Sequence, residues 1–172
     1  MSMIVDLTGV LKETGNKLDL TGSLDLDDVK YLGEDFRFLG TPTICGSIFN
    51  NGESLILKAK VDLCLGVRCA RCMQELEESF SFELEESLVR EEDVTDPDGD
   101  HIVFTGSEID LTEIVQTGFF MNVSGKFLCS ETCKGLCPDC GVNLNLEACT
   151  CKDEVIDPRW ESLKKIMDSN ED

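Results

Sequence analysis

The residues of this sequence best suited to chemistry are its ten cysteines. Eight of them fall into four close pairs, and two thiolates separated by two residues form the usual half-site for zinc in proteins. The pairs are Cys69 with Cys72, Cys129 with Cys133, Cys137 with Cys140, and Cys149 with Cys151. Because zinc prefers four ligands in a tetrahedron, four half-sites predict two whole sites.

The spacing of the pairs indicates how they combine. Only the short segment 141–148 separates the third pair from the fourth, so we expect these two pairs to form a local site. Cys69 and Cys72 would then take Cys129 and Cys133 as their partners. The six cysteines from 129 to 151 could equally form one site with spare ligands. The sequence therefore leaves open whether one or two zinc ions bind.

Zinc held by four thiolates would be structural, because no coordination position remains for a water nucleophile. Three other uses of the cysteines stay open: an iron–sulfur cluster, a redox or metal-handling role of Cys69 and Cys72, and reduced thiols without metal. The remaining two, Cys45 and Cys64, lie within strand patterns, and we expect them to be small buried residues. No nucleophile–base pair is evident around His101, the single histidine, so we expect no catalytic role for this residue.

A long hairpin is expected to carry the first pair of cysteines. Apolar residues occupy every second position from 55 to 67, and the alternation resumes over 76–88. A period of two is typical of strands with one buried face. The turn between the two runs contains Cys69-Ala70-Arg71-Cys72, a zinc-knuckle arrangement in which backbone N–H groups face the sulfurs. The tip of the hairpin therefore needs partner cysteines from elsewhere in the chain.

Other strands are indicated by weaker alternation. We expect a first strand over 4–11, a second strand or an irregular edge over 18–26 in which Gly22 could form a bulge, and one more strand over 102–104. Residues 34–89 should form an antiparallel meander, with a hairpin turn at Asn50-Asn51-Gly52 because Asn and Gly tolerate positive φ.

Two helices are marked by their N-terminal residues. Asp110-Leu111-Thr112-Glu113 has the pattern of a capping box, and apolar residues follow at helical spacing to about residue 122. Asp157-Pro158 begins a last helix, with Asp as the N-cap and Pro in the first turn.

These elements predict an α+β fold: an antiparallel, partly barrel-like β-sheet with one packed helix, a Cys-rich zinc lobe and a C-terminal helix. At 172 residues the chain is expected to form a single domain. Its parts would be a β-rich core over 1–125 with the helix at about 111–122, the zinc lobe over 126–156, and the C-terminal helix over 157–172.

The formal net charge is −20, from 35 acidic and 15 basic residues. Such an acidic surface repels a phosphate backbone and attracts basic partners. We interpret the acidic residues between Glu75 and Asp93 as a solvated face rather than as general acids or bases. Basic residues gather near the cysteines and could contact RNA or a partner; they include Arg68, Arg71, Lys126, Lys134 and Lys152.

The cellular compartment is suggested by what the sequence does not contain. It has no run of about 18 apolar residues, and its N-terminus has no basic segment followed by an apolar run. We therefore expect a cytoplasmic protein without a membrane segment. Ten cysteines in such a protein are more typical of metal ligands than of a disulfide framework.

Three motifs resemble those of a known family. They are Val67-Arg68-Cys69-Ala70-Arg71-Cys72-Met73 before an acidic strand, the run from Cys133 to Asn145 followed by Cys149-Thr150-Cys151, and the closing residues 157–163. They resemble the YceD-like family, the large ribosomal RNA subunit accumulation proteins, from about Gly40 onward. The resemblance implies a role in ribosome biogenesis, supporting accumulation of the large-subunit ribosomal RNA in bacteria and plastids, without enzymatic activity. The family's gene often neighbours that of a small basic large-subunit ribosomal protein.

The function we expect is that of a non-enzymatic, zinc-stabilised assembly factor for the large ribosomal subunit. Its acidic surface would hold a basic ribosomal protein or another assembly partner. One alternative is a direct RNA-binding zinc module that uses the basic residues around the knuckles. Another is a redox or metal-handling protein. The sequence fixes neither the partner nor the oligomeric state.

Overall fold

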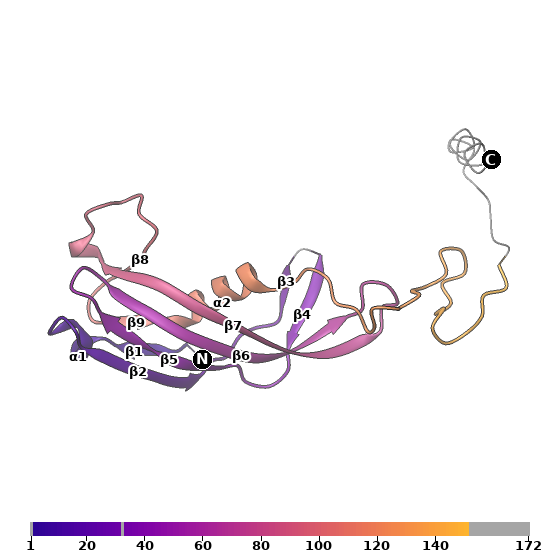
Figure 1. Cartoon of the computed structure of the whole chain (residues 1–172), viewed down its shortest axis with the longest axis horizontal. Coiled ribbons are helices and arrows are strands. Elements are labelled where there is room, and N and C mark those ends of the chain that lie inside the picture. The colour runs from indigo at the N-terminus through magenta and orange to yellow at the C-terminus, as the bar shows by residue number, and fades with distance from the viewer. Residues whose placement is uncertain (1, 32, 152–172) are drawn as a thin grey trace, which may run out of the picture.

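The computed structural model describes residues 2–31 and 33–151. The strands of this part are β1 (Ile4–Asp6), β2 (Lys17–Ser23), β3 (Val29–Tyr31), β4 (Glu34–Phe38), β5 (Thr43–Asn50), β6 (Leu55–Arg68), β7 (Glu75–Arg90), β8 (Ile102–Phe104) and β9 (Glu108–Asp110) (Figure 1). The helices are α1 (Thr8–Leu11), the 3-10 helix η1 (Glu91–Asp93) and α2 (Leu111–Asn122). The C-terminal helix expected over 157–172 lies outside the described residues.

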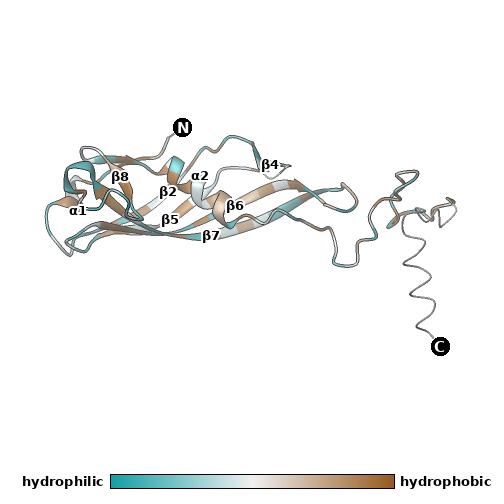
Figure 2. Cartoon of the chain, turned by 90° about the horizontal axis from the view of Figure 1, so that it is seen from above, coloured by the Kyte–Doolittle hydropathy of each residue, from teal (hydrophilic) through white to brown (hydrophobic). Residues whose placement is uncertain are grey.

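The β6–β7 hairpin is the longest unit of the sheet, and its register brings the apolar residues of both strands to one face. Val61 lies opposite Phe82, and the ladder closes at the tip with Arg68 opposite Glu75. The buried residues of β6 include Leu55, Leu57, Ala59, Val61, Leu63, Leu65 and Val67. Figure 2 shows the alternation of hydrophobic and hydrophilic residues along these strands. The predicted hairpin, with Cys69 and Cys72 beyond its last pair, is confirmed.

Strand β6 organises the main sheet because three strands pair with it. On one side β5 pairs with residues 55–62 and β4 with residues 65–66, while β7 follows the other side along its whole length. The turn at Asn50-Asn51-Gly52 joins β5 to β6 as predicted. However, β4 pairs with β6 and not with β5, so residues 34–89 do not form a simple meander.

The fold is α+β and mostly antiparallel, as expected, but the sheets are open. β2 borders β5, β3 borders β4, and β8 pairs in parallel with the end of β7, which makes a seven-stranded sheet. A two-stranded sheet of β1 and β9 accompanies it. The partly barrel-like arrangement was therefore predicted wrongly for the described residues. Different strands border the two ends of β6, so the sheet branches along that strand and its edges do not meet.

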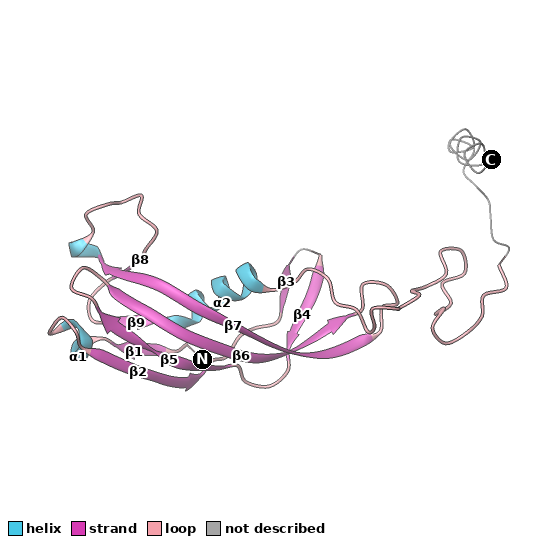
Figure 3. Cartoon of the chain, viewed as in Figure 1, coloured by secondary structure: helices cyan, strands magenta, loops and turns pink. Residues whose placement is uncertain are grey.

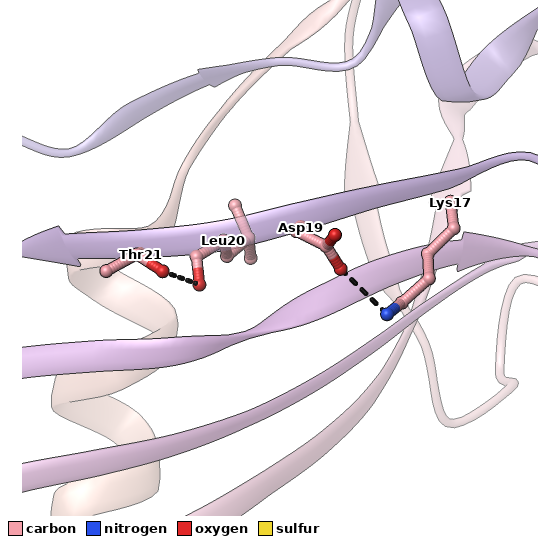
Figure 4. Close-up of polar contacts among 4 residues, drawn as sticks. All are labelled: Lys17, Asp19, Leu20 and Thr21. Carbon is pink, nitrogen blue, oxygen red and sulfur yellow. Dashed lines mark hydrogen bonds and ion pairs between the residues drawn. The ribbon is translucent and has the colours of Figure 1, made fainter.

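The N-terminal part differs from its prediction in two further ways. Residues 4–11 contain the short strand β1 followed by α1, and not one strand. Gly22 keeps the regular register of β2 with β5, so no bulge forms there. Along β2 the Lys17 ammonium lies 2.7 Å from the Asp19 carboxylate, and the Thr21 hydroxyl donates to the Leu20 carbonyl at 2.8 Å (Figure 4). The polar positions of this edge strand are solvated.

Helix α2 packs against the sheet and spans the range that the sequence predicts. Asp110 caps it, because its carboxylate accepts a hydrogen bond from the Thr112 amide at 2.9 Å. Gly118 lies against β7, where a Cβ atom would stand 2.3 Å from the Leu84 side chain. Phe119 is fully buried and meets Phe36 edge to face, with ring centroids 5.5 Å apart. Among the described residues, none of the helices has the length and apolar character that a membrane span requires.

After α2 the described chain contains no further helix or strand. Figure 3 shows the segment from Val123 to Cys151 as loops that pass the tip of the β6–β7 hairpin and then extend beyond it. Within this part, structure is held by isolated bridges, turns and the cysteines themselves.

Candidate metal centres

The first group of sulfur atoms lies at the tip of the β6–β7 hairpin. Cys69, Cys72, Cys129 and Cys133 bring their sulfurs within 4.8 Å of one another. The Cys69 and Cys133 sulfurs are 3.8 Å apart, and those of Cys72 and Cys129 are 3.6 Å apart. Zn–S bonds of about 2.3 Å in a tetrahedron place sulfurs about 3.8 Å apart. The spacing of this group therefore fits a four-thiolate metal site.

The fold positions this group by pairing the chain after α2 with the hairpin tip. Cys69 forms a parallel bridge with Phe127, and the Ala70 amide donates to the Phe127 carbonyl at 2.8 Å. The knuckle is closed by the Met73 amide, which donates to the Cys69 carbonyl at 2.9 Å. Three of the four cysteines are buried, and only Cys129 is partly exposed. A bound metal would join the sheet to the segment that follows the helix.

The second group lies further along the loops and is more open to solvent. Cys137, Cys140, Cys149 and Cys151 also bring their sulfurs within 4.8 Å of one another. The Cys149 sulfur lies 3.3 Å from that of Cys137 and 3.6 Å from that of Cys140. Cys140 is exposed, whereas Cys137 is buried and the other two are partly exposed. This group could hold a second ion close to the protein surface.

A short ribbon shapes the second knuckle. Leu136 and Asn143 form an antiparallel bridge, and the Cys137 amide donates to the Val142 carbonyl at 2.9 Å. The Gly141 amide donates to the Cys137 carbonyl at 2.9 Å, with Gly141 at φ +75°. No atom lies within 4 Å of where a Cβ on Gly141 would be. Glycine therefore suits position 141 because the turn needs a left-handed backbone conformation there, and not because backbone and sulfur approach each other closely.

Backbone amides favour a thiolate at the first cysteine of the hairpin knuckle. Burial raises the pKa of Cys69, but hydrogen bonds from the backbone of Cys129, Cys72 and Arg71 outweigh it and lower the pKa to about 6. Hydrogen bonds with the Cys133 and Cys72 sulfurs raise the pKa of Cys129 to about 12. The Cys69 sulfur is thus ready to bind a metal as a thiolate. The Cys129 thiol keeps its proton until a metal ion displaces that proton.

The second knuckle repeats this arrangement. The backbone amides of Cys140 and Asp139 lower the pKa of Cys137 to about 7. Hydrogen bonds with the Cys149 and Cys140 sulfurs raise the pKa of Cys151 to about 12. In both knuckles two of the amides come from the third and fourth residues of the C-x-x-C motif, and at Cys69 the backbone of Cys129 adds another hydrogen bond. The motif therefore builds the same thiolate pocket twice.

The structure groups the eight cysteines in the two sets that their spacing predicts. Metal binding itself stays a prediction, as does the absence of a redox role. The prediction for Cys45 and Cys64 was wrong, because Cys45 is exposed and Cys64 partly exposed. Cys45 lies opposite Lys60, and Cys64 opposite Ser79. Both cysteines fall in the polar register of their strands, which faces solvent.

At least one of the basic residues near the cysteines has contacts inside the protein. Arg71 is used within the protein, since its guanidinium donates to the carbonyls of Glu131 at 3.1 Å and Cys133 at 2.9 Å. Three others are exposed, namely Arg68, Lys126 and Lys134. Lys152 lies outside the described residues. Contact with RNA or a partner stays a prediction for these residues, and Arg71 has a structural role that its charge alone did not indicate.

Asn145 is a residue of the site that sequence reasoning missed. Its amide nitrogen donates to the Cys133 sulfur at 3.3 Å, although Asn145 lies in the loop that closes the second group. Its position between two knuckle motifs was visible in the sequence, but a contact with the other group depends on how the loop folds back.

Comparison with known proteins identifies the family. A family model described as "Large ribosomal RNA subunit accumulation protein YceD" matches residues 57–167. The chain belongs to the YceD family. The match covers more than half of the chain and includes all eight cysteines of the two groups. It begins within β6, somewhat later than the resemblance from about Gly40 suggests.

Relatives of this YceD family member occur in plants and bacteria. A protein of Arabidopsis thaliana named large ribosomal RNA subunit accumulation protein YCED homolog 1, chloroplastic, is 26% identical over 159 residues, which are 75% of this chain and 50% of the relative. The maize protein of the same name is 33% identical over 63 residues, 36% of this chain and 22% of its own length. An uncharacterised protein of Mycobacterium tuberculosis is 30% identical over 107 residues, 60% of this chain and 51% of its own.

The chain thus spans about half the length of the Arabidopsis and mycobacterial relatives, and less of the maize one. No solved structure matches the chain significantly.

Proposed function

We propose that this protein is a non-enzymatic, zinc-stabilised factor of ribosome biogenesis in the cytoplasm, which supports accumulation of the large-subunit ribosomal RNA. The observation that carries the proposal is the pair of four-sulfur groups in a member of the YceD family. The names of the family and of its chloroplast relative support the biological role. A four-thiolate site supports a structural ion, because it leaves no position for a reacting water.

The metal would fix the loops after α2 against the hairpin tip. Residues 123–151 bury few apolar side chains of their own, and the described core consists of the sheet with α1 and α2. Zinc supplies folding free energy where a hydrophobic core is too small. Each filled site would also add about −2 to the charge of the protein, because four thiolates meet one dication.

The partner we propose is a basic protein of the large subunit or of its assembly. A net charge of −20 favours a positively charged partner and opposes direct binding to a phosphate backbone. The internal use of Arg71 further reduces the number of cations available to RNA near the knuckles. Charge complementarity of this kind accelerates association and weakens as ionic strength rises.

Metal analysis tests the first part of the proposal. The purified protein is expected to contain about two zinc ions per chain. Cys72→Ser and Cys133→Ser should each lose the same ion, and Cys140→Ser and Cys151→Ser the other. Cys45→Ser is the matched control, since Cys45 is exposed and lies outside both groups. Stoichiometric iron, or full folding without any metal, would contradict the proposal.

A depletion experiment tests the biological role. Loss of the protein is expected to lower the ratio of large-subunit to small-subunit ribosomal RNA, and the Cys45→Ser gene should restore the ratio better than Cys72→Ser. Affinity capture should retain a basic assembly protein after nuclease treatment and release it as salt increases. Capture that depends on intact RNA would instead favour the RNA-binding alternative.

A further inference from the structure

The two groups of cysteines share the short segment Lys134-Gly135-Leu136, which separates Cys133 of the first group from Cys137 of the second. On one side of this segment, the Leu136 amide donates to the Arg71 carbonyl at 3.1 Å. On its other side, the Gly135 carbonyl accepts from the Leu144 amide at 3.0 Å. The segment is therefore bonded both to the hairpin knuckle and to the loop that closes the second group.

Gly135 makes this close packing feasible. It has φ +78°, and a Cβ atom there would stand 3.1 Å from the Arg71 carbonyl oxygen. A side chain would thus meet backbone atoms that cannot move aside easily. The shared segment is held tightly against the first knuckle at the point where the second knuckle begins.

Asn145 completes the connection with its side chain. Its carboxamide oxygen accepts from the Lys134 amide at 2.8 Å, and its nitrogen donates to the Cys133 sulfur at 3.3 Å. The Asn143 carboxamide oxygen accepts from the same nitrogen at 2.8 Å and from the Asn145 amide at 3.0 Å. Both donors and the acceptor of the Asn145 carboxamide are therefore oriented by neighbours, and one donor faces a sulfur of the other group.

We infer that Asn145 is a positioning residue that couples the two metal sites, so that filling the second site tightens the first. The inference rests on the proposed metal binding. An N–H group directed at a metal-bound thiolate stabilises its charge, and loss of such an outer partner commonly weakens metal binding 10- to 100-fold. The loop that carries Asn145 runs from Cys140 to Cys149, so an ion in the second site holds the donor in place.

Cadmium NMR of the full chain can read the two sites separately, because each four-thiolate site gives its own resonance. Cys72→Ser and Cys140→Ser assign the resonances to the first and second site. Asn145→Asp keeps the oxygen that accepts from Lys134 but removes the N–H group that faces Cys133. Leu146→Ala is the matched control, because Leu146 is the next residue and is 81% exposed.

In competition with a chelator, Asn145→Asp is expected to weaken cadmium binding at the first site by about 10- to 100-fold and to shift that resonance. Leu146→Ala should change neither quantity. Cys140→Ser alone should weaken the first site by a similar factor, and Asn145→Asp should add less than about twofold in that background, because both changes remove the same contact.

Two outcomes would overturn the coupling while leaving the proposed metal binding intact. One is an unchanged first site in Asn145→Asp with both resonances present. The other is fully additive losses in the combined variant. If the wild-type protein shows neither resonance, the proposed metal binding fails, and the coupling fails with it.

Discussion

Met73 carries a long side chain, yet its backbone adopts a conformation that is usually found only for glycine. It follows the second cysteine of the hairpin knuckle and has φ 60°, the only positive φ of a residue other than glycine among the described residues. Gly141 occupies the same place in the second knuckle, with φ +75°. The left-handed conformation costs a residue with a Cβ about 1–2 kcal/mol. The first knuckle is thus formed against local strain, and the metal would have to offset it.

Replacing Met73 by Gly is expected to stabilise the protein by about 0.5–1 kcal/mol, since the relief of strain exceeds the entropy that Gly loses on folding. Met73 is 55% exposed, so little packing is lost. The free energy of unfolding in urea measures the effect. Gln74→Gly is the control for chain entropy alone and should destabilise, while Gly141→Ala should also destabilise. A loss of stability in Met73→Gly equal to that in Gln74→Gly would contradict this account.

The number of protons that each zinc ion should release on binding follows from the thiol pKa values. Cys69 and Cys137 have pKa values lowered to about 6 and about 7, and the usual value is 9.0. At about pH 8 both are already thiolates, so each zinc ion should displace fewer than four protons. At about pH 5 both are thiols, and each ion should displace close to four.

Metal affinity should therefore fall as pH falls, and the fall should become steeper below the two lowered pKa values. The lowered pKa values also make the metal-free fold less stable as pH falls. The thiolates of Cys69 and Cys137 contribute stability above pH 9, which is lost as pH falls through about 7 and about 6. Calorimetry in buffers of different ionisation enthalpy gives the proton count. A count that is the same at both pH values would contradict the assignment of these thiolates.

At the scale of elements, α2 approaches the sheet closely because Gly118 has no side chain. A Cβ there would stand 2.3 Å from Leu84 and 3.0 Å from Phe82, both on the buried face of β7. The helix thereby brings Phe119 to the ring of Phe36 on β4. Because the loops that bear six of the cysteines follow α2, the depth of this packing also sets where they leave the sheet.

Gly118→Val is expected to destabilise the protein by about 2 kcal/mol, because two added methyl groups and the Cβ must displace side chains that are already packed. Thr117→Val is the matched control: it adds no volume, and Thr117 is exposed on the same helix. Its effect should stay within about 0.5 kcal/mol. Thermal or urea unfolding measures both. Equal stability of the two variants would show that α2 can shift to accept the side chain.

The sequence predicts the elements whose signal is long or local. Alternation over β6 and β7 spans many residues and places the buried face correctly, and the cap at Asp110 fixes the start of α2. The grouping of the cysteines also follows from their spacing. β3 and β9 have three residues each, which is too few to show a period. The pairing of β4 with β6 depends on tertiary packing that no local pattern records.

The residue type of Cys45 and Cys64 explains why the sequence wrongly predicts that they are buried. Ile44 and Ile48 are buried, and Cys45 lies in the opposite register with Ser47. A cysteine is compatible with either face, so its residue type gave no guidance. The structural roles of Arg71 and Asn145 could not be predicted from the sequence either. These roles consist of hydrogen bonds to residues about 60 and 12 positions away.

In the molecule as a whole, the hydrophobic core and the metal groups are separate. The main cluster of buried apolar residues contains none of the eight metal-group cysteines. Cys69, Cys72 and Cys133 form a second, small cluster at the hairpin tip. The sheet with its helices should therefore hold together through burial of apolar surface, whereas the loops after α2 would depend on thiolates gathered around the proposed ion.

Removal of metal by a chelator is accordingly expected to release the segment 126–151 and the hairpin tip while the sheet stays folded. Hydrogen exchange should become fast at Ala70 and Cys137, whose amides bond to Phe127 and Val142, and stay slow at Val61 in the middle of β6. Cys140→Ser in excess zinc provides the control, because the first site then stays filled, so that only the second group is released and Ala70 stays protected. Loss of protection throughout β6 would show that the metal sites stabilise the whole fold. Unchanged protection at Ala70 without metal would show that the loops hold by backbone pairing alone, and the structural role proposed for the metal would then be wrong.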